Sequence, residues 1–329
     1  MSFDPQQFGA AARIDGGSRR PLAAVWIRLC LFLAPVLLIV CLPVYLIDPY
    51  GLFSRRSIVD DGVRFDTAAR VNHVLLGMIS FTKRPTPNIL LGDSQMNHFK
   101  AEEVEAIAGR PYSNLSYGGG TLAESIATFW YAAHIVKLES VYFGMSYYSF
   151  TDNSRDRVGA AVRVIRNPLA YFSSGDVLEA AWDDAVARVT HHAVTYQPSV
   201  SAAAFWRQQL GELARRKQTY SASERTIGDL REIVRYCRAH GIAIFFVIPP
   251  EHEDVRTRME QMGMLDDYLT FKATVAALGP TYDCDVANGI TRDASKFQDP
   301  FHTTLAAASL ITRSIWTGSR EWCDFVRAD

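Results

Sequence analysis

Short apolar runs alternate with longer helical patterns over most of this 329-residue chain, and this alternation is what most constrains its fold. Each run has the length and apolar content of a strand buried on both faces of a parallel sheet. Helical spacing of apolar residues fills the gaps, notably over residues 121–137, 221–240 and 305–316. The pattern predicts an α/β domain with a parallel sheet. The expected strands cover residues 88–91, 112–117, 141–145, 242–248 and 282–286.

Residues 146 to about 220 interrupt this alternation with helical patterns, such as 176–192, and many aromatic side chains. We interpret this stretch as an insertion that follows the third strand. In an open α/β sheet, ligands bind beyond the carboxyl ends of the strands. The insertion therefore either roofs a binding site or serves packing alone.

An apolar segment precedes the domain. Between Arg28 and Asp48 lie 19 uncharged residues, 29–47, and a helix of that length spans roughly the hydrocarbon core of a bilayer. A cleaved signal peptide is the alternative, but its apolar core is usually about 7–15 residues long and is followed by small residues. The sequence Leu-Pro-Val-Tyr-Leu at 42–46 offers no such site. We therefore expect one retained transmembrane helix.

The predicted organisation is a cytoplasmic tail at residues 1–20, an anchor at 21–48, a connecting segment at 49–87 and one domain at 88–329 with its insertion. Arginines 13, 19, 20 and 28 precede the uncharged segment 29–47, and arginines 55, 56 and 64 follow it. This small excess favours a cytoplasmic N-terminus by the positive-inside rule. The protein is thus predicted to be a single-pass protein of the inner (cytoplasmic) membrane, with its domain facing the periplasm or the cell exterior.

The charge of the chain excludes one class of partner. It carries 34 basic and 35 acidic residues, with a net charge of −1, and therefore lacks the positive footprint of a nucleic-acid-binding protein. The only tight basic run, Arg215-Arg216-Lys217, is short and fits a solvated helix face, so we assign it no role.

Five cysteines give no sign of a metal or redox site. Cys30 and Cys41 fall in the apolar segment, which leaves Cys237, Cys284 and Cys323 for the domain. No Cys-x-x-Cys or Cys/His spacing is present. If the domain lies in an oxidising compartment, one disulfide among these three cysteines is an alternative. We favour buried free thiols.

The sequence Gly92-Asp93-Ser94 ends the first expected strand. A serine at a strand-to-helix turn projects its hydroxyl over the sheet edge, where backbone N–H groups can stabilise an oxyanion. A second pattern, Asp299-Pro-Phe-His302, precedes the last helix. An imidazole can take the proton of a serine while a carboxylate fixes its tautomer. Taken singly, each pattern is also explained by a helix cap or a surface histidine.

In this order, and with an α/β alternation between them, the two patterns resemble the SGNH (GDSL-like) hydrolase family over roughly residues 88–318. The resemblance implies a three-layer sandwich with a parallel sheet, Ser94 as nucleophile, and His302 and Asp299 as its partners. The glycine loop Gly118-Gly119-Gly120 resembles the family's second block, which implies that Gly119 joins the Ser94 N–H in the oxyanion hole, with Gly118 and Gly120 as alternatives. Three glycines after a strand also let a ligand approach the backbone closely.

One family block departs from its pattern. Where the family has Gly-x-Asn-Asp, this chain has Gly144-Met145-Ser146-Tyr147, so Ser146 replaces the asparagine that donates to the oxyanion. A serine hydroxyl can donate but is shorter, and losing one donor typically costs about 2.7–4 kcal/mol of transition-state stabilisation.

Several other residues are weaker candidates for lining the pocket: Asp93, Asn97, His98, Glu251 and His252. Asn97 can equally cap a turn, and His98 can be a partly exposed histidine. Asp293 is an alternative carboxylate to Asp299, although its spacing to His302 gives no support.

The resemblance implies an O-acyltransferase, because an anchor followed by an outward SGNH domain is similar to proteins that work beside membrane-bound O-acyltransferases in acetylating exported polysaccharides. A carbohydrate or acyl esterase with the same residues is one alternative, and a non-catalytic scaffold or glycan-binding partner is another. The expected partners are a polysaccharide or acyl ester and a membrane-bound acyltransferase. Neither a metal nor a cofactor is expected.

Overall fold

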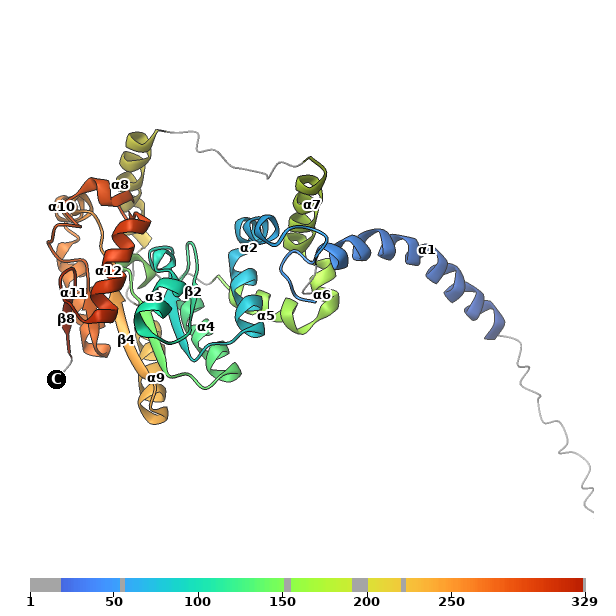
Figure 1. The fold of residues 1–329 in the computed structure, drawn as a ribbon, viewed down its shortest axis with the longest axis horizontal. Helices are drawn as coiled ribbons and strands as arrows, with labels where there is room; N and C mark the ends of the chain where they lie inside the picture. Colours follow the sequence, from blue (N-terminus) through green and yellow to red (C-terminus); the bar gives the residue numbers. More distant parts are fainter. Residues whose placement is uncertain (1–18, 54–56, 151–154, 191–200, 220–222, 328–329) are drawn as a thin grey trace, which may run out of the picture.

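The structure is a computed structural model that describes residues 19–53, 57–150, 155–190, 201–219 and 223–327. The part of the expected cytoplasmic tail that covers residues 1–18 lies outside the described residues, as do His191 and His192 of the helix expected at 176–192. Figure 1 shows an α/β domain from which one long N-terminal helix, α1, projects.

A six-stranded sheet in the order β2-β1-β3-β4-β5-β8 forms the centre of the domain. Neighbouring strands from β2 through β5 pair in parallel, and β8 pairs with β5 antiparallel. The expected parallel sheet is therefore corrected at one edge. The bounds are β1 Asn88–Gly92, β2 Tyr112–Ser116, β3 Ser140–Gly144, β4 Ala243–Ile248, β5 Thr281–Asp283 and β8 Asp324–Val326.

Helices cover both faces of the sheet. On β1, Ile89 and Leu91 join the larger core cluster with residues of α4 (Leu122–Ile135) and α9 (Glu224–His240). Leu90, which points to the other face, joins a second cluster with residues of α3 (Ala101–Ala108) and α12 (Leu305–Thr317). This alternation of neighbouring residues is what a strand buried on both faces requires. The result is the three-layer arrangement expected for the domain.

The expected helices form with small changes at their ends. Helix α4 begins with a capping box, in which Thr121 accepts from the Glu124 N–H and Glu124 accepts from the Thr121 N–H. Helix α9 begins at Glu224 with Ser223 as its N-cap, three residues later than expected. Two further helices, α10 (Glu253–Gln261) and α11 (Leu265–Leu278), lie between β4 and β5.

The stretch between β3 and β4 is helical in its described parts. It contains η2 (Tyr147–Phe150), α5 (Arg157–Arg166), α6 (Pro168–Ser173), α7 (Gly175–Thr190) and α8 (Ala202–Thr219). Much of the expected connecting segment is also helical, because α2 (Asp61–Lys83) buries Leu75, Met78 and Phe81 in the main core. Helix α2 packs against α5 and α7, as both ribbon views show.

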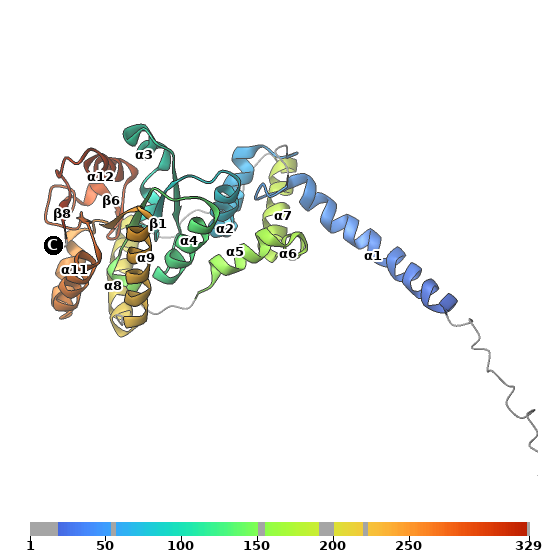
Figure 2. The same ribbon diagram turned by 90° about the horizontal axis from the view of Figure 1, so that it is seen from below.

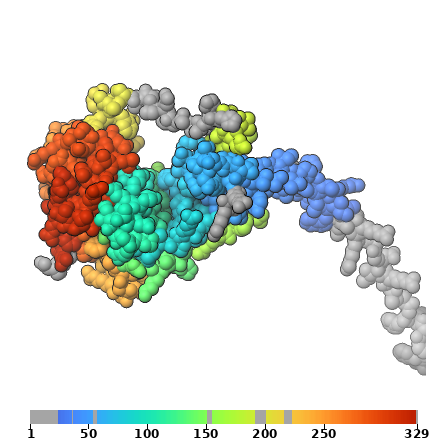
Figure 3. Space-filling view, in the orientation of Figure 1, coloured from blue at the N-terminus to red at the C-terminus, as the bar shows by residue number. Residues whose placement is uncertain are grey.

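Helix α1 (Arg19–Ile47) leads away from the domain (Figures 2 and 3). Within the described residues, no single helix has both the length and the hydropathy of a membrane span. Two halves of α1, Ala24–Pro35 and Leu37–Ile47, meet these criteria only together, with a bend of 42° between them and on length and composition alone.

The cysteines differ from the expectation of free thiols. Cys284, just after β5, and Cys323, just before β8, form a disulfide across 39 residues of sequence. Cys237 is buried as a free thiol in α9, where burial raises its pKa to about 12. The bonded pair was not predictable from spacing, because only the antiparallel pairing of β5 with β8 brings its two members together.

Candidate active site

Three loops that follow neighbouring strands meet at the carboxyl edge of the sheet. They leave β1 at Gly92, β2 at Ser116 and β3 at Gly144, and these strands are adjacent in the sheet. Gly92 has a φ of 153°, and a Cβ at this position would lie 2.6 Å from Cγ of Met96. Only glycine lets the chain turn here while Met96 packs over the strand end. The turn places Ser94 above the sheet.

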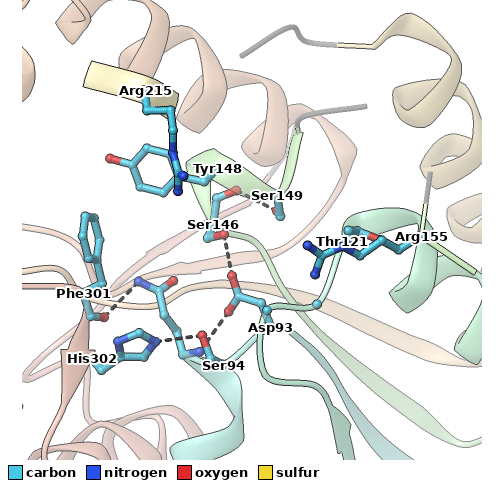
Figure 4. A pocket seen from close by; sticks show the side chains of 13 residues that line it. Asp93, Ser94, Thr121, Ser146, Tyr148, Ser149, Arg155, Arg215, Phe301 and His302 are labelled. Atoms are coloured by element: carbon cyan, nitrogen blue, oxygen red, sulfur yellow. Dashed lines mark hydrogen bonds between the residues drawn. The ribbon is translucent and has the colours of Figure 1, made fainter. Parts of the chain in front are cut away.

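Ser94 is hydrogen bonded to His302, as Figure 4 shows: Ser94 Oγ lies 2.7 Å from His302 Nε2. His302 Nδ1 lies 2.8 Å from Asp299 Oδ2 and 2.9 Å from Oδ1. Because an ionised carboxylate only accepts hydrogen bonds, Nδ1 must donate, which leaves Nε2 to accept the hydroxyl proton of Ser94. The structure thus brings together the three residues that the sequence paired across about two hundred positions.

Asp299 ends β6 (Phe297–Asp299), and His302 begins β7 (His302–Thr303), its antiparallel partner. Burial raises the pKa of the Asp299 carboxyl, but hydrogen bonds from His302 and from the N–H groups of Phe301 and His302 outweigh it and lower the pKa below its ordinary value. The Asp299 side chain is 9% exposed and that of His302 is 26% exposed. The carboxylate is therefore ionised and enclosed, while solvent or substrate reaches the imidazole.

Ser94 and His302 open onto a pocket of about 350 Å³ at this edge. Most of its lining is polar, and it is formed by Asp93, Ser94, Gln95, Gly119, Gly120, Thr121, Ser146, Tyr148, Ser149, Arg155, Arg215, Phe301 and His302. Ligand sites commonly have volumes of this order. The pocket therefore has room for a small ligand beside Ser94.

The glycine loop lies beside Ser94, and Gly119 and Gly120 line the pocket whereas Gly118 does not. The Gly120 N–H donates to the Tyr117 carbonyl at 2.8 Å, so it is not available to a ligand. Gly119 is exposed, with a φ of 58° in the left-handed region that favours glycine. Of the three glycines, Gly119 thus combines a place in the pocket lining with a backbone conformation that suits an oxyanion donor, and its role in an oxyanion hole stays a prediction.

An arginine from the insertion holds this loop. Arg157, at the start of α5, donates to the carbonyls of Gly118 at 3.1 Å and Gly119 at 3.2 Å. Its guanidinium also makes two hydrogen bonds of 2.7 Å to the carboxylate of Glu124, whose side chain is 1% exposed. Burial raises the pKa of Glu124, but the hydrogen bonds from Arg157 outweigh this effect. The pKa therefore lies below its ordinary value. The Glu124–Arg157 pair thus fixes the carbonyl side of the glycine loop.

Ser146 does not take the place expected for it. Its hydroxyl donates to Asp93 Oδ2 at 2.6 Å, as drawn in Figure 4, and Asp93 Oδ1 accepts the Gln95 N–H at 2.9 Å. A serine hydroxyl has one proton, so in this conformation Ser146 does not donate to an oxyanion. It instead orders Asp93, the residue before Ser94.

The remaining candidates lie around the pocket rather than in its wall. Asn97 is exposed on η1 (Met96–His98) and faces a separate hollow beside β2. His98 donates from Nδ1 to the Thr303 carbonyl at 2.7 Å, and burial lowers its pKa. His252 is 6% exposed and caps α10, and Asp293 caps η3 (Ala294–Lys296) at the surface. None of these lines the pocket, so the expectation that Asn97, His98 and His252 do is corrected.

Glu251, the other weak candidate, is buried behind the site. Gln95 donates from Nε2 to Glu251 Oε1 at 3.2 Å and to the Phe301 carbonyl at 3.0 Å. Gln95 therefore connects the Ser94 turn to the loop that carries His302. Its position next to Ser94 was the only signal of this role in the sequence.

Several lining residues were not predicted from the sequence, and the two arginines among them matter most. Arg155 precedes α5, and Arg215 lies in α8, within the basic run to which the sequence gave no role. Nothing in the sequence places either residue near Ser94, because both belong to the stretch between β3 and β4.

Comparison with known proteins adds little. No protein-family model matches the sequence, and no curated protein matches it either. Among solved structures, a protein from Streptococcus pneumonia assigned as a platelet activating factor matches with a TM-score of 0.38 at 8% identity, over 74% of this chain and 91% of that one.

Two further structures give similar values. A protein assigned as a lipolytic protein of the G-D-S-L family from Desulfitobacterium hafniense DCB-2 has a TM-score of 0.33 at 9% identity, covering 70% of this chain and 98% of that one. A protein assigned as an acylhydrolase from Bacteroides fragilis has a TM-score of 0.36 at 12% identity, covering 79% and 97%. Scores of this size do not establish a relationship, so the functional assignment depends on the geometry of this site.

Proposed function

We propose that this protein is a serine-dependent O-acyltransferase that acts outside the cytoplasm on hydroxyl groups of an exported polysaccharide. The observation that carries the proposal is the chain of hydrogen bonds from Ser94 through His302 to Asp299 at the wall of an open, polar pocket. This arrangement fits acyl transfer through a covalent intermediate.

In the first half-reaction, Ser94 Oγ attacks the carbonyl carbon of an acyl ester while His302 Nε2 takes the hydroxyl proton. The tetrahedral oxyanion accepts hydrogen bonds from the N–H groups of Ser94 and Gly119. Asp299 stabilises the imidazolium. When the intermediate collapses, the bond to the leaving oxygen breaks, His302 returns the proton to that oxygen, and the acyl group stays on Ser94.

In the second half-reaction, an acceptor hydroxyl attacks the acyl-Ser94 carbonyl while its proton passes to His302. The Ser94–acyl bond breaks, Ser94 regains a proton from His302, and the acyl group leaves on the acceptor. Water in place of the acceptor gives the esterase reaction. An esterase is therefore the second candidate function. The open pocket and the 26% exposed side chain of His302 favour it, because water can reach the same intermediate.

Two features support a site of action outside the cytoplasm. The apolar side chains of α1 are largely exposed, among them Trp26 at 64% and Phe32 at 76%, which suits a lipid environment. The disulfide between Cys284 and Cys323 suits an oxidising compartment. A membrane-bound acyltransferase partner would supply the acyl group from the cytoplasmic side.

Protease accessibility in spheroplasts tests the orientation, since a domain digested only after cell lysis would contradict it.

Covalent labelling tests the chemistry. We expect a fluorophosphonate probe to label the full-length protein in detergent, and we expect Ser94→Ala to abolish the labelling without changing the thermal midpoint.

A second experiment separates transfer from hydrolysis. It measures the turnover of a chromogenic acetyl ester by the same protein, with and without an oligosaccharide acceptor. If Ser94→Ala and His302→Ala both retained wild-type polymer acylation in cells, the non-catalytic scaffold would be the correct interpretation.

A further inference from the structure

Two arginines face the pocket from opposite sides of the 146–149 segment. Figure 4 shows Arg215 beside Tyr148 at one side and Arg155 beside Thr121 at the other, with Ser146 and Ser149 between them. Both arginines are exposed. They are 60 positions apart in sequence, in a coil and in α8, yet both line the pocket that contains Ser94. Two cations therefore flank the same reaction space.

Among the described residues that line the pocket, one carboxylate faces the two arginines. It belongs to Asp93, and it accepts hydrogen bonds from Ser146 and from the Gln95 N–H. Arg215 pairs through Nη2 with Glu212 on the same helix, which uses one of the five N–H donors of a guanidinium. Donors of both guanidinium groups are thus left for a ligand in the pocket.

Guanidinium groups suit one chemical class of ligand. Their planar fork donates two parallel hydrogen bonds to a carboxylate or a phosphate, which a neutral hydroxyl cannot accept in the same way. A neutral sugar would leave both arginines merely solvated. A sugar that carries an oxyanion would instead gain charge-assisted bonds while a hydroxyl of the same or the next residue approaches Ser94.

We propose that the pocket selects an acceptor saccharide that bears an anionic group, a carboxylate or a phosphate, held by Arg155 and Arg215. This proposal deepens the proposed function and rests on it for the role of the saccharide as acceptor. The binding step itself requires no chemistry at Ser94, so it is measurable on its own.

The experiment is calorimetric titration of full-length Ser94→Ala protein in detergent at low salt. The ligands are trigalacturonate, maltose 1-phosphate and neutral maltotriose. We expect at least one of the two anionic ligands to bind ten or more times more tightly than maltotriose, and the carboxylate and phosphate arms identify which anion is preferred. Raising the salt concentration should reduce this preference, because exposed charges are screened.

Variants assign the preference to the arginines. In the same background, the double substitution Arg155→Gln and Arg215→Gln should lower the ratio of anionic to neutral affinity at least tenfold. The matched control is Arg163→Gln, since the Arg163 side chain is 69% exposed on α5 but does not line this pocket. The control should leave the ratio unchanged.

Two results would overturn the anionic pocket: equal affinity for charged and neutral ligands before substitution, or a preference that survives the double substitution. Failure of the proposed function has a different signature. If the anionic preference and its loss are observed but the wild-type protein forms no acyl-Ser94 with any donor, the binding site stands and the acyltransferase does not.

Discussion

Ser146 shows how one hydroxyl changes the interpretation of an oxyanion hole. Its hydroxyl donates to Asp93, so Ser146 supports the Ser94 turn through the residue before Ser94. We expect Ser146→Ala to lower kcat/KM on a chromogenic acetyl ester by less than about tenfold, because loss of a true oxyanion donor costs about 10²- to 10³-fold. Ser146→Thr keeps a hydroxyl and serves as the control. A hundredfold loss in Ser146→Ala with an unchanged thermal midpoint would mean that Ser146 does donate during the reaction.

Asp299 gives a second prediction at this scale. Its hydrogen bonds keep its pKa below the ordinary value, so the carboxylate stays ionised between pH 5 and 8 and contributes no titration there. We expect Asp299→Asn to lower kcat by about three to four orders of magnitude, because an amide no longer fixes the required tautomer of His302. The measurement is kcat from pH 5 to 9. A rate within tenfold of wild type would remove Asp299 from the mechanism.

At the scale of elements, the start of α5 and the start of α4 together hold the glycine loop. Arg157 contacts two glycine carbonyls and the buried Glu124. Because Arg157 holds the carbonyls of Gly118 and Gly119, it also limits the direction of the Gly119 N–H. We therefore consider Arg157 a positioning residue. In the proposed mechanism it would act on the oxyanion through its bonds to the loop.

We therefore expect Arg157→Gln to lower kcat by about 10- to 100-fold with little change in KM, since a displacement of about 1 Å can cost 10²-fold. Arg157→Lys should restore only part of the rate, because lysine cannot make the two-bond contact with Glu124. Arg163→Gln on the same helix is the control. A loss confined to stability, with kcat per folded molecule unchanged, would make the role of Arg157 purely structural.

The same elements show what the sequence can and cannot predict. Strands β1, β3 and β4 were predictable, because buried parallel strands are apolar runs such as the one that ends at Gly92. Strand β8 was not, since its three residues, Asp324–Val326, have no such run. Ser94, His302 and Asp299 were found because their patterns are local. Arg155 and Arg157 were not, because their roles depend on contacts that only the folded chain creates.

The pairing of β5 with β8 carries a prediction on stability. The Cys284–Cys323 disulfide closes a loop of about forty residues, and chain entropy assigns such a crosslink about 4 kcal/mol. The double substitution Cys284→Ser and Cys323→Ser should lower the free energy of unfolding by about that amount. Cys237→Ser is a matched buried-cysteine control outside the crosslink. If reduction of the wild-type protein left its thermal midpoint unchanged, the crosslink would contribute nothing to stability.

At the scale of the whole molecule, the helices next to α1 connect with the site. Helix α1 packs against α7, α7 against α2, α2 against α5, and α5 supplies Arg157 to the glycine loop. Just after α1, Asp48 accepts a hydrogen bond from Tyr171 at 2.8 Å, and Arg64 donates to the Asp48 carbonyl at 2.6 Å. A continuous packed path therefore runs from α1 to the glycine loop.

A buried carboxyl group lies within this path. Asp184, on α7, is 0% exposed where α7 packs against α2. Burial raises its pKa from 3.8 to about 7, and the charge of Arg64 offsets only part of the effect. The folded protein therefore retains a proton on Asp184 at pH values where the unfolded chain has lost it. By linkage, the contribution of Asp184 to the free energy of unfolding falls as pH rises from about 4 to about 7 and is then constant.

Replacing this group with a neutral isostere should remove that dependence. Asp184→Asn should match the wild-type protein near pH 4 and exceed its stability by roughly 2–4 kcal/mol at pH 8, because the amide carries no charge to bury. Thermal unfolding of full-length protein in detergent, measured from pH 4 to 9, gives the comparison. Glu179→Gln on the same helix, with a side chain 58% exposed, should leave the pH profile unchanged. Parallel pH profiles for wild type and Asp184→Asn would contradict a protonated Asp184. The predicted divergence would instead mean that pH acts on the helices that connect α1 with the site.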